Sequence, residues 1–280
     1  MAYCYFNGKI MPESEAGVSI RDVGVLRGYG VFDLLRTYGG RPFLFDEHFG
    51  RLVRSAAALG LEVPVSRQQA FTIVKKLLLK NKLPESTVRF VLTGGKAADS
   101  VHFNRATPTF FILISPFYEL PASAHAKGAA LETREHKREF PEVKSLNYLT
   151  AVKANNPLKG KAPFEILYTW QGRVLEAATS NFFMFSGDTL VTPARDVLIG
   201  TTRNLVIKLA KKEFKLKERD VSVRELFAGT EAFLTATNKD IVPVVSVNGK
   251  KIGGGKVGER TKRLMNAFCY FVDAWRADTA

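Results

Sequence analysis

One lysine in this chain stands where an amine nucleophile is useful. Lys144 lies between Val143 and Ser145, shortly after Pro141, a residue that disfavours helix immediately before it. We predict a helix that starts behind the proline with Ser145 or Lys144 in its first turn, where the helix dipole and burial would both favour the neutral lysine amine. Such a lysine could form a Schiff base. The alternative is an ordinary surface lysine on a helix.

Three other segments offer groups that suit an anion. Gly200-Thr201-Thr202 precedes an apolar helical pattern and would supply amides and hydroxyls at a helix N-terminus, a natural phosphate cradle. Thr237 and Asn238 follow a predicted strand and form a second polar cluster. Arg51 could add a charge-assisted contact. The alternatives are a routine threonine N-cap and a solvated arginine on a helix face.

Glu176 is the acidic residue of interest. It stands between a predicted strand and a run of small residues at 177–181, where backbone can approach a ligand closely. A carboxylate there could keep a heterocyclic nitrogen protonated. An exposed glutamate at a strand end is the alternative.

Composition narrows the class of protein. The 280 residues are 46% hydrophobic and 24% charged, as in ordinary globular proteins, and no apolar run approaches a bilayer span. Two cysteines, four scattered histidines and no signal-peptide pattern favour a cytoplasmic protein without a metal site. The net charge of +14 is spread among acidic residues, which argues against nucleic-acid binding and for a pocket that takes small anions.

Hydrophobic periodicity divides the chain into two domains. Residues 1–117 predict a small α+β domain with an antiparallel sheet, beginning with a hairpin around Asn7-Gly8. Asp46 is predicted to cap a helix that leaves Arg51 off its core face, and Ser66 with Gln69 forms a capping box for the next helix. Residues 118–128 read as a linker, and 129–280 as a larger, strand-rich domain that ends in a long helix.

Six short motifs together resemble the class IV, or fold type IV, pyridoxal-phosphate aminotransferases. The resemblance covers residues 1 to about 275. The motifs occur in the family order and at the family spacing: Arg27–Asp33, His48–Leu52, Lys144–Tyr148, Glu176–Asn181, Gly200–Arg203 and Asp240–Val244. The resemblance implies a two-domain α+β homodimer that transfers an amino group between an amino acid and a 2-oxo acid by a ping-pong mechanism, with pyridoxal 5'-phosphate as cofactor.

The resemblance also implies a role for each candidate residue. Lys144 would form the Schiff base and shuttle the α-proton, and Glu176 would pair with the pyridine nitrogen. The phosphate would be bound by Arg51, Thr201, Thr202 and Thr237, with Asn238 beside it. Tyr148 would bind the phenolic oxygen, and Leu198 would pack against the ring.

The substrate class is less clearly indicated. Leu34 stands where aminodeoxychorismate lyases carry a catalytic threonine, which counts against a lyase. Branched-chain enzymes carry a tyrosine and an arginine two residues apart; Arg89 matches the arginine, but Thr87 replaces the tyrosine. Gly94 stands near where the best-known D-amino-acid enzymes place their carboxylate-binding arginine.

We interpret the chain as a divergent D-amino-acid transaminase that uses other arginines. Arg27, Arg89 and Arg36 are the candidates for the substrate carboxylate, because the guanidinium fork matches a carboxylate. Arg27 ranks first, since its loop reaches the partner subunit's site in this family. D-alanine or D-glutamate is the expected substrate; branched-chain L-transamination, lyase chemistry and a non-enzymatic basic binding protein are the alternatives.

Overall fold

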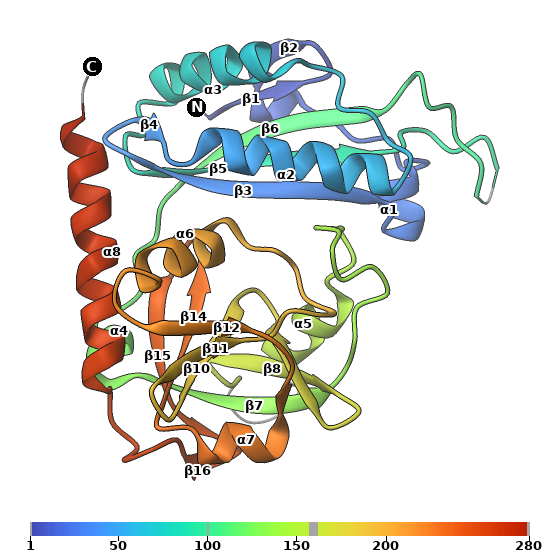
Figure 1. Cartoon of the computed structure of the whole chain (residues 1–280). Helices are drawn as coiled ribbons and strands as arrows, with labels where there is room; N and C mark the ends of the chain where they lie inside the picture. The colour runs from blue at the N-terminus through green and yellow to red at the C-terminus, as the bar shows by residue number, and fades with distance from the viewer. Residues whose placement is uncertain (1, 100, 157–161, 279–280) are drawn as a thin grey trace. The chain divides into compact units, whose positions relative to one another are not determined.

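A computed structural model of the chain describes residues 2–99, 101–156 and 162–278, which form two compact units (Figure 1). The first comprises Met1–Tyr118 and Val143–Asn147; the second comprises Glu119–Glu142 and Tyr148–Ala280. The segment 143–147, predicted to lie in the second domain, belongs to the first unit because Val143 is buried in that unit's hydrophobic core.

The first unit contains a six-stranded antiparallel sheet in the order β2-β1-β6-β5-β3-β4. Its strands are β1 (Tyr3–Phe6), β2 (Lys9–Pro12), β3 (Gly30–Tyr38), β4 (Arg41–Pro42), β5 (Ser86–Thr93) and β6 (Thr109–Pro116). Its helices are η1 (Glu13–Glu15), α1 (Val23–Arg27), α2 (Phe45–Ala58) and α3 (Arg67–Asn81). The predicted opening hairpin and antiparallel α+β arrangement are present.

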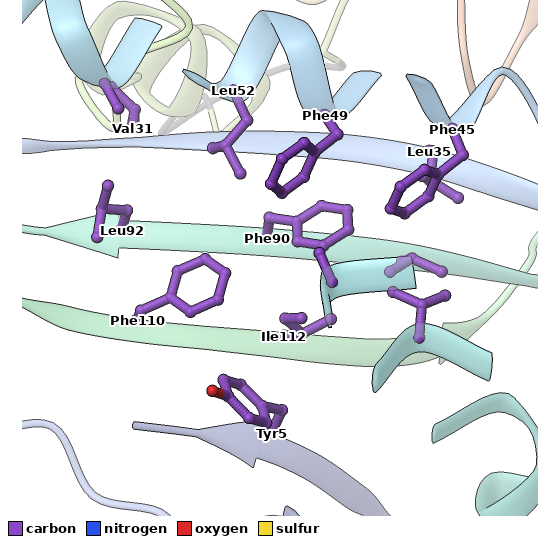
Figure 2. Close-up of a cluster of buried hydrophobic side chains, with 14 of the residues drawn as sticks. Tyr5, Val31, Leu35, Phe45, Phe49, Leu52, Phe90, Leu92, Phe110 and Ile112 are labelled. Carbon is purple, nitrogen blue, oxygen red and sulfur yellow. The ribbon is translucent and has the colours of Figure 1, made fainter. Parts of the chain in front are cut away.

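The core of the first unit lies between the sheet and the two helices α2 and α3. Figure 2 shows Phe45, Phe49 and Leu52 of α2 pointing toward Phe90 of β5. Phe45 packs edge-on against Phe90, with ring centroids 6.3 Å apart. These side chains follow the helical spacing that the sequence shows, so apolar burial fixes α2 along the sheet.

The structure confirms the predicted N-terminal cap of α3 but not that of α2. The capping box of α3 is confirmed, because Ser66 Oγ accepts from Gln69 N–H and the Gln69 side chain accepts from Ser66 N–H. The predicted Asp46 cap is wrong: Leu44 is the N-cap and α2 begins at Phe45, two residues earlier than predicted. Phe45 is drawn into the core, and Asp46 in the first turn pairs with Arg67 instead.

The second unit contains a ten-stranded mixed sheet in the order β12-β11-β10-β14-β15-β7-β8-β9-β13, with β16 paired to β15. The strands are β7 (Ala129–Glu135), β8 (Glu165–Trp170), β9 (Arg173–Ala177), β10 (Asn181–Ser186), β11 (Thr189–Thr192), β12 (Lys215–Glu218), β13 (Val221–Ser222), β14 (Glu231–Ala236), β15 (Asp240–Val247) and β16 (Lys250–Lys251). The helices are α4 (Ala122–Lys127), α5 (Leu149–Asn155), α6 (Thr201–Ala210), α7 (Val223–Ala228) and α8 (Glu259–Ala277).

The predicted linker at 118–128 is not a plain linker. Residues 122–127 form α4, which contacts β15, and His125 Nδ1 lies 3.1 Å from the carbonyl oxygen of Ile241. The segment therefore packs as part of the second unit. In the described ranges 2–99, 101–156 and 162–278, no helix combines the length and the apolar character needed to cross a bilayer.

Candidate cofactor site

Lys144 lies in an extended segment, not in a helix. Helix α5 begins only at Leu149, so the predicted first-turn position is wrong and a helix dipole does not act on this amine in the predicted way. The reason is backbone pairing with β3: Phe32 N–H donates to the Lys144 carbonyl at 2.9 Å, and Ser145 bridges to Val31. On the other side, Lys144 N–H donates to Ser55 Oγ at 3.1 Å.

The ring of Phe32 is contacted by two cationic side chains. Lys144 Nζ lies 4.5 Å from the ring centroid, and the Arg89 guanidinium lies 5.3 Å from the same centroid. Both contacts are within cation–π range. The first unit therefore places the Lys144 amine and the Arg89 guanidinium around one aromatic side chain.

Arg51 is buried, contrary to its predicted place off the core face of α2. Its Nε and Nη2 donate to the two oxygens of Asp33 at 2.8 and 2.9 Å, and His48 Nδ1 lies 2.6 Å from Asp33 Oδ1. Because a carboxylate only accepts, His48 carries its proton on Nδ1. Asp33, in the middle of β3, is the acceptor that draws Arg51 inward.

Asp33, His48 and Arg51 form a buried triad, and the charge of each member follows from its burial and its partners. Burial alone would raise the pKa of Asp33, but the positive charge of Arg51 and the His48 contact outweigh burial and lower it far below its usual range. Burial lowers the pKa of His48, although Asp33 opposes that shift. The triad therefore holds a carboxylate, a neutral imidazole and a guanidinium.

Glu176 is buried near the end of β9, so it is not an exposed strand-end residue. Its Oε2 accepts from Leu198 N–H at 3.1 Å and from Asn181 Nδ2 at 3.3 Å. Its Oε1 lies 3.3 Å from Arg138 Nε. The carboxylate is thus oriented from two directions.

Arg138 was not identified from the sequence, since no pattern singles it out. Its guanidinium lies 5.2 Å from the Tyr148 ring centroid, and it donates to the carbonyl of Ala178 at 2.7 Å. Burial by itself would lower the pKa of Arg138, but the facing Glu176 and the hydroxyls of Tyr148 and Tyr168 raise it. Arg138 is therefore a charged partner that links Glu176 to Tyr148.

The polar groups predicted for a phosphate lie on neighbouring parts of the second unit. Thr201 and Thr202 are buried in the first turn of α6, after Gly200. Thr235 pairs in register with Asn181 on the adjacent strand, and Thr237 and Asn238 form the turn after β14. Thr237 is half-buried, and Asn238 is exposed.

The three arginines proposed for the substrate carboxylate differ in their surroundings. Arg36 is buried, with its guanidinium 4.0 Å from the Tyr38 centroid and 3.6 Å from that of Phe117. Arg27 is exposed at the end of α1, and Arg89 is exposed on β5 beside Phe32. Arg36 is thus packed between aromatic rings, whereas Arg27 and Arg89 are exposed.

The fold and these clusters define an α+β enzyme of fold type IV. The chain belongs to the class IV aminotransferases, since the sequence model of that family, Amino-transferase class IV, matches residues 30–247. A putative branched-chain-amino-acid aminotransferase of Methanocaldococcus jannaschii is 34% identical over 271 residues, 94% of each chain. A D-alanine aminotransferase of Bacillus licheniformis is 30% identical over 267 residues, again 94% of each. The crystal structure of the Escherichia coli branched-chain amino acid aminotransferase superposes with a TM-score of 0.88 at 26% identity, covering 96% of this chain and 94% of that one.

The predictions of family, fold class and enzyme type are confirmed, and pyridoxal 5'-phosphate is the cofactor that class IV aminotransferases use. The second unit fits a phosphate group. Thr235 Oγ1 is buried without a hydrogen-bond partner among the described residues. A Cβ at Gly200 would lie 2.2 Å from Asn181 Oδ1, so any other residue there would displace the Asn181 amide from Glu176 and the Leu198 carbonyl. An anionic ligand at this end of α6 would meet amides, hydroxyls and the positive end of a helix dipole.

Proposed function

We propose that the enzyme exchanges an amino group between an amino acid and a 2-oxo acid by a ping-pong mechanism, with Lys144 as the base that moves the α-proton. The observation that carries this proposal is the anchoring of Lys144: β3 and α2 bind its main chain from both sides, and its amine lies over Phe32. A base held in place lowers the entropic cost of reaching the reactive geometry.

The remaining residues would bind the cofactor and set its protonation. When bound, pyridoxal 5'-phosphate supplies a ring that accepts the electron pair left by proton removal. Glu176 would hold a proton at the pyridine nitrogen, while Arg138 and Asn181 orient its carboxylate. The phosphate would be bound by Thr201, Thr202, Thr235, Thr237, Asn238 and Arg51. Tyr148 would donate to the phenolic oxygen, and Leu198 would pack against the ring.

Covalent trapping tests the role of Lys144. Wild-type protein treated with pyridoxal 5'-phosphate and borohydride should carry a reduced adduct on Lys144, found by peptide mapping, and should absorb visible light before reduction. Lys144→Ala should lose both the adduct and transamination. Lys153→Ala, an exposed lysine of α5, is the matched control and should keep both. A Lys144→Ala variant that still forms the adduct and turns over substrate would end the assignment.

For the substrate, we infer a D-amino acid of the alanine or glutamate type, with Arg89 and Arg27 binding its carboxylate. The support is the contact of Arg89 with Phe32, the ring that Lys144 also contacts, together with the D-alanine aminotransferase relative. Arg27 follows Asp22, whose carboxylate caps α1 and accepts from Thr93 and Thr109. That anchoring would hold the Arg27 loop in place for a partner subunit in a homodimer, and we expect the homodimer to work in the cytoplasm.

Branched-chain L-transamination is the second candidate. The Methanocaldococcus jannaschii relative favours it, and Arg89 also matches the arginine of the branched-chain pattern. D-alanine, D-glutamate, L-leucine and L-glutamate, each assayed with an oxo-acid acceptor, separate the two. The D-specific proposal requires turnover of D-alanine or D-glutamate. Arg89→Leu should then raise the KM for that substrate by about tenfold or more while cofactor binding is retained. Strong turnover of L-leucine with neither D-substrate used would establish the second candidate instead.

A further inference from the structure

Two turns of the second unit carry or adjoin groups assigned above to the cofactor, and they lie at the same end of the sheet. The first, residues 178–180, connects Glu176 on β9 to Asn181 on β10. The second, residues 237–239, follows β14 and contains Thr237 and Asn238. Because β10 and β14 are antiparallel neighbours with Asn181 opposite Thr235, the two turns lie side by side.

A buried ion pair ties these turns together. Glu165, the first residue of β8, receives hydrogen bonds from the Thr179 hydroxyl at 2.8 Å, from the Ser180 hydroxyl at 2.8 Å and from the Thr179 backbone N–H. Lys239 Nζ lies 2.8 Å from Glu165 Oε2. It also donates to the hydroxyls of Thr179 at 2.6 Å and Ser180 at 3.1 Å.

The burial of this cluster distinguishes it from an ordinary surface ion pair. The side chain of Glu165 is 3% exposed and that of Lys239 is 12% exposed. Removing either partner of so buried a pair strongly destabilises the folded protein, because the remaining charge stays buried without compensation. Lys239 connects the second turn to the first, and Glu165 connects both turns to β8.

We propose that Lys239 and Glu165 are positioning residues that hold these two turns in fixed relation, so that Glu176 and Thr237 are presented to the cofactor together. The inference rests on the proposed function, since it concerns turns assigned to the cofactor. Neither residue needs to touch the cofactor. Each acts through the turn that it holds, and loosening one turn frees the other.

The test uses Lys239→Met, which keeps much of the apolar stem but removes the charge. Lys262→Met is the matched control, because it breaks an exposed lysine–glutamate pair with Glu259 in the same unit. For each cofactor-loaded protein, the rate of cofactor dissociation is measured from the loss of visible absorption, at a temperature where circular dichroism shows every variant folded. We expect about tenfold faster dissociation in Lys239→Met and the wild-type rate in Lys262→Met.

Hydrogen exchange in the cofactor-free proteins gives a second readout that does not depend on activity. Peptides covering 177–181 and 236–240 should both exchange faster in Lys239→Met than in wild type, because the Thr179 N–H loses the fixed orientation of its Glu165 acceptor. The double variant Glu165→Gln/Lys239→Met leaves no unpaired buried charge. It should dissociate cofactor more slowly than Lys239→Met alone, but still faster than wild type, because the link between the turns is lost. The comparison with wild type tests the proposal if the single variant does not fold.

The outcomes separate this inference from the proposed function. A wild-type protein that takes up no pyridoxal 5'-phosphate overturns the proposed function. A wild type that holds the cofactor, beside a Lys239→Met variant with an unchanged dissociation rate and unchanged exchange in both turns, overturns the positioning role. Faster exchange in the 236–240 turn alone would also overturn it, since the proposal requires the turns to respond together.

Discussion

Replacing Asp33 by asparagine should destabilise the protein far more than the same change at an exposed aspartate. Asp33 is completely buried and accepts from Arg51 Nε, Arg51 Nη2, His48 Nδ1 and the Leu34 amide. Asparagine has nearly the same shape, but it carries no charge and turns an N–H₂ group toward one of these donors. The Arg51 guanidinium, with a side chain only 7% exposed, would then lose the carboxylate with which it pairs in the folded protein.

The expected loss is about 3–5 kcal/mol of the free energy of unfolding, the range for breaking a buried pair from one side. A typical domain is stable by only about 5–15 kcal/mol, so a shift of this size moves the denaturation midpoint clearly. Urea unfolding followed by circular dichroism at pH 7 measures it, with protein and cofactor concentrations held equal.

Asp46→Asn is the matched control. Asp46 also pairs with an arginine through two hydrogen bonds, from Arg67 Nε at 2.6 Å and Arg67 Nη2 at 2.8 Å, but both side chains are more than half exposed. Solvent screens such a pair, so the same substitution there should have a much smaller effect. Equal losses at the two positions would refute the argument that burial of the Asp33 pair sets its strength.

The difference between wild type and Asp33→Asn should also depend on pH. The folded state lowers the pKa of Asp33 from its ordinary value of 3.8, so its contribution to stability is fully present above that value. The contribution declines as the pH falls below 3.8 toward the lower pKa of the folded protein. Unfolding curves at pH 7 and pH 3 should therefore show a smaller gap at the lower pH, and a gap that does not narrow would contradict the charge-based explanation.

Three further substitutions test other parts of the site. Glu176→Gln should lower kcat by about 100-fold or more while cofactor binding is retained, because a neutral amide cannot hold the pyridine proton. Steady-state kinetics and a cofactor titration measure the two effects. Unimpaired turnover would mean that another group faces that nitrogen. Arg138→Gln should lower the free energy of unfolding in urea by about 3 kcal/mol, because Glu176 would lose the cation Arg138 while it stays buried. A decrease no larger than that caused by replacing an exposed arginine would count against the pair. His48 has a lowered pKa in the folded state, so its contribution to stability is present above pH 6.5 and declines as the pH falls below that value. In His48→Gln the melting temperature should therefore fall less between pH 7.5 and pH 5.5 than in wild type. An equal dependence of melting temperature on pH in the two proteins would show that His48 does not titrate in this range.

The sequence alone was enough to identify the family, because it contains six short motifs in the family order. Each motif is a run of neighbouring residues that can be recognised without the fold. Helical spacing located α2 and α3, and the Ser66–Gln69 pair fixed where α3 starts. Alternation and turn residues located most strands of both units. These features depend on neighbours within a few residues, so a linear reading can recover them.

Only the tertiary structure decided what surrounds each charged side chain. Arg51 lies on a helix whose pattern predicts a solvated arginine, but Asp33 of a strand 18 residues earlier draws it inward. Lys144 follows a proline that predicts a helix start, yet pairing with β3 keeps it extended. Arg138 and Lys239 find their partners Glu176 and Glu165 at sequence separations of 38 and 74 residues. Burial and pairing of this kind depend on strands and turns brought together from distant parts of the chain, and no local pattern encodes which charges will meet.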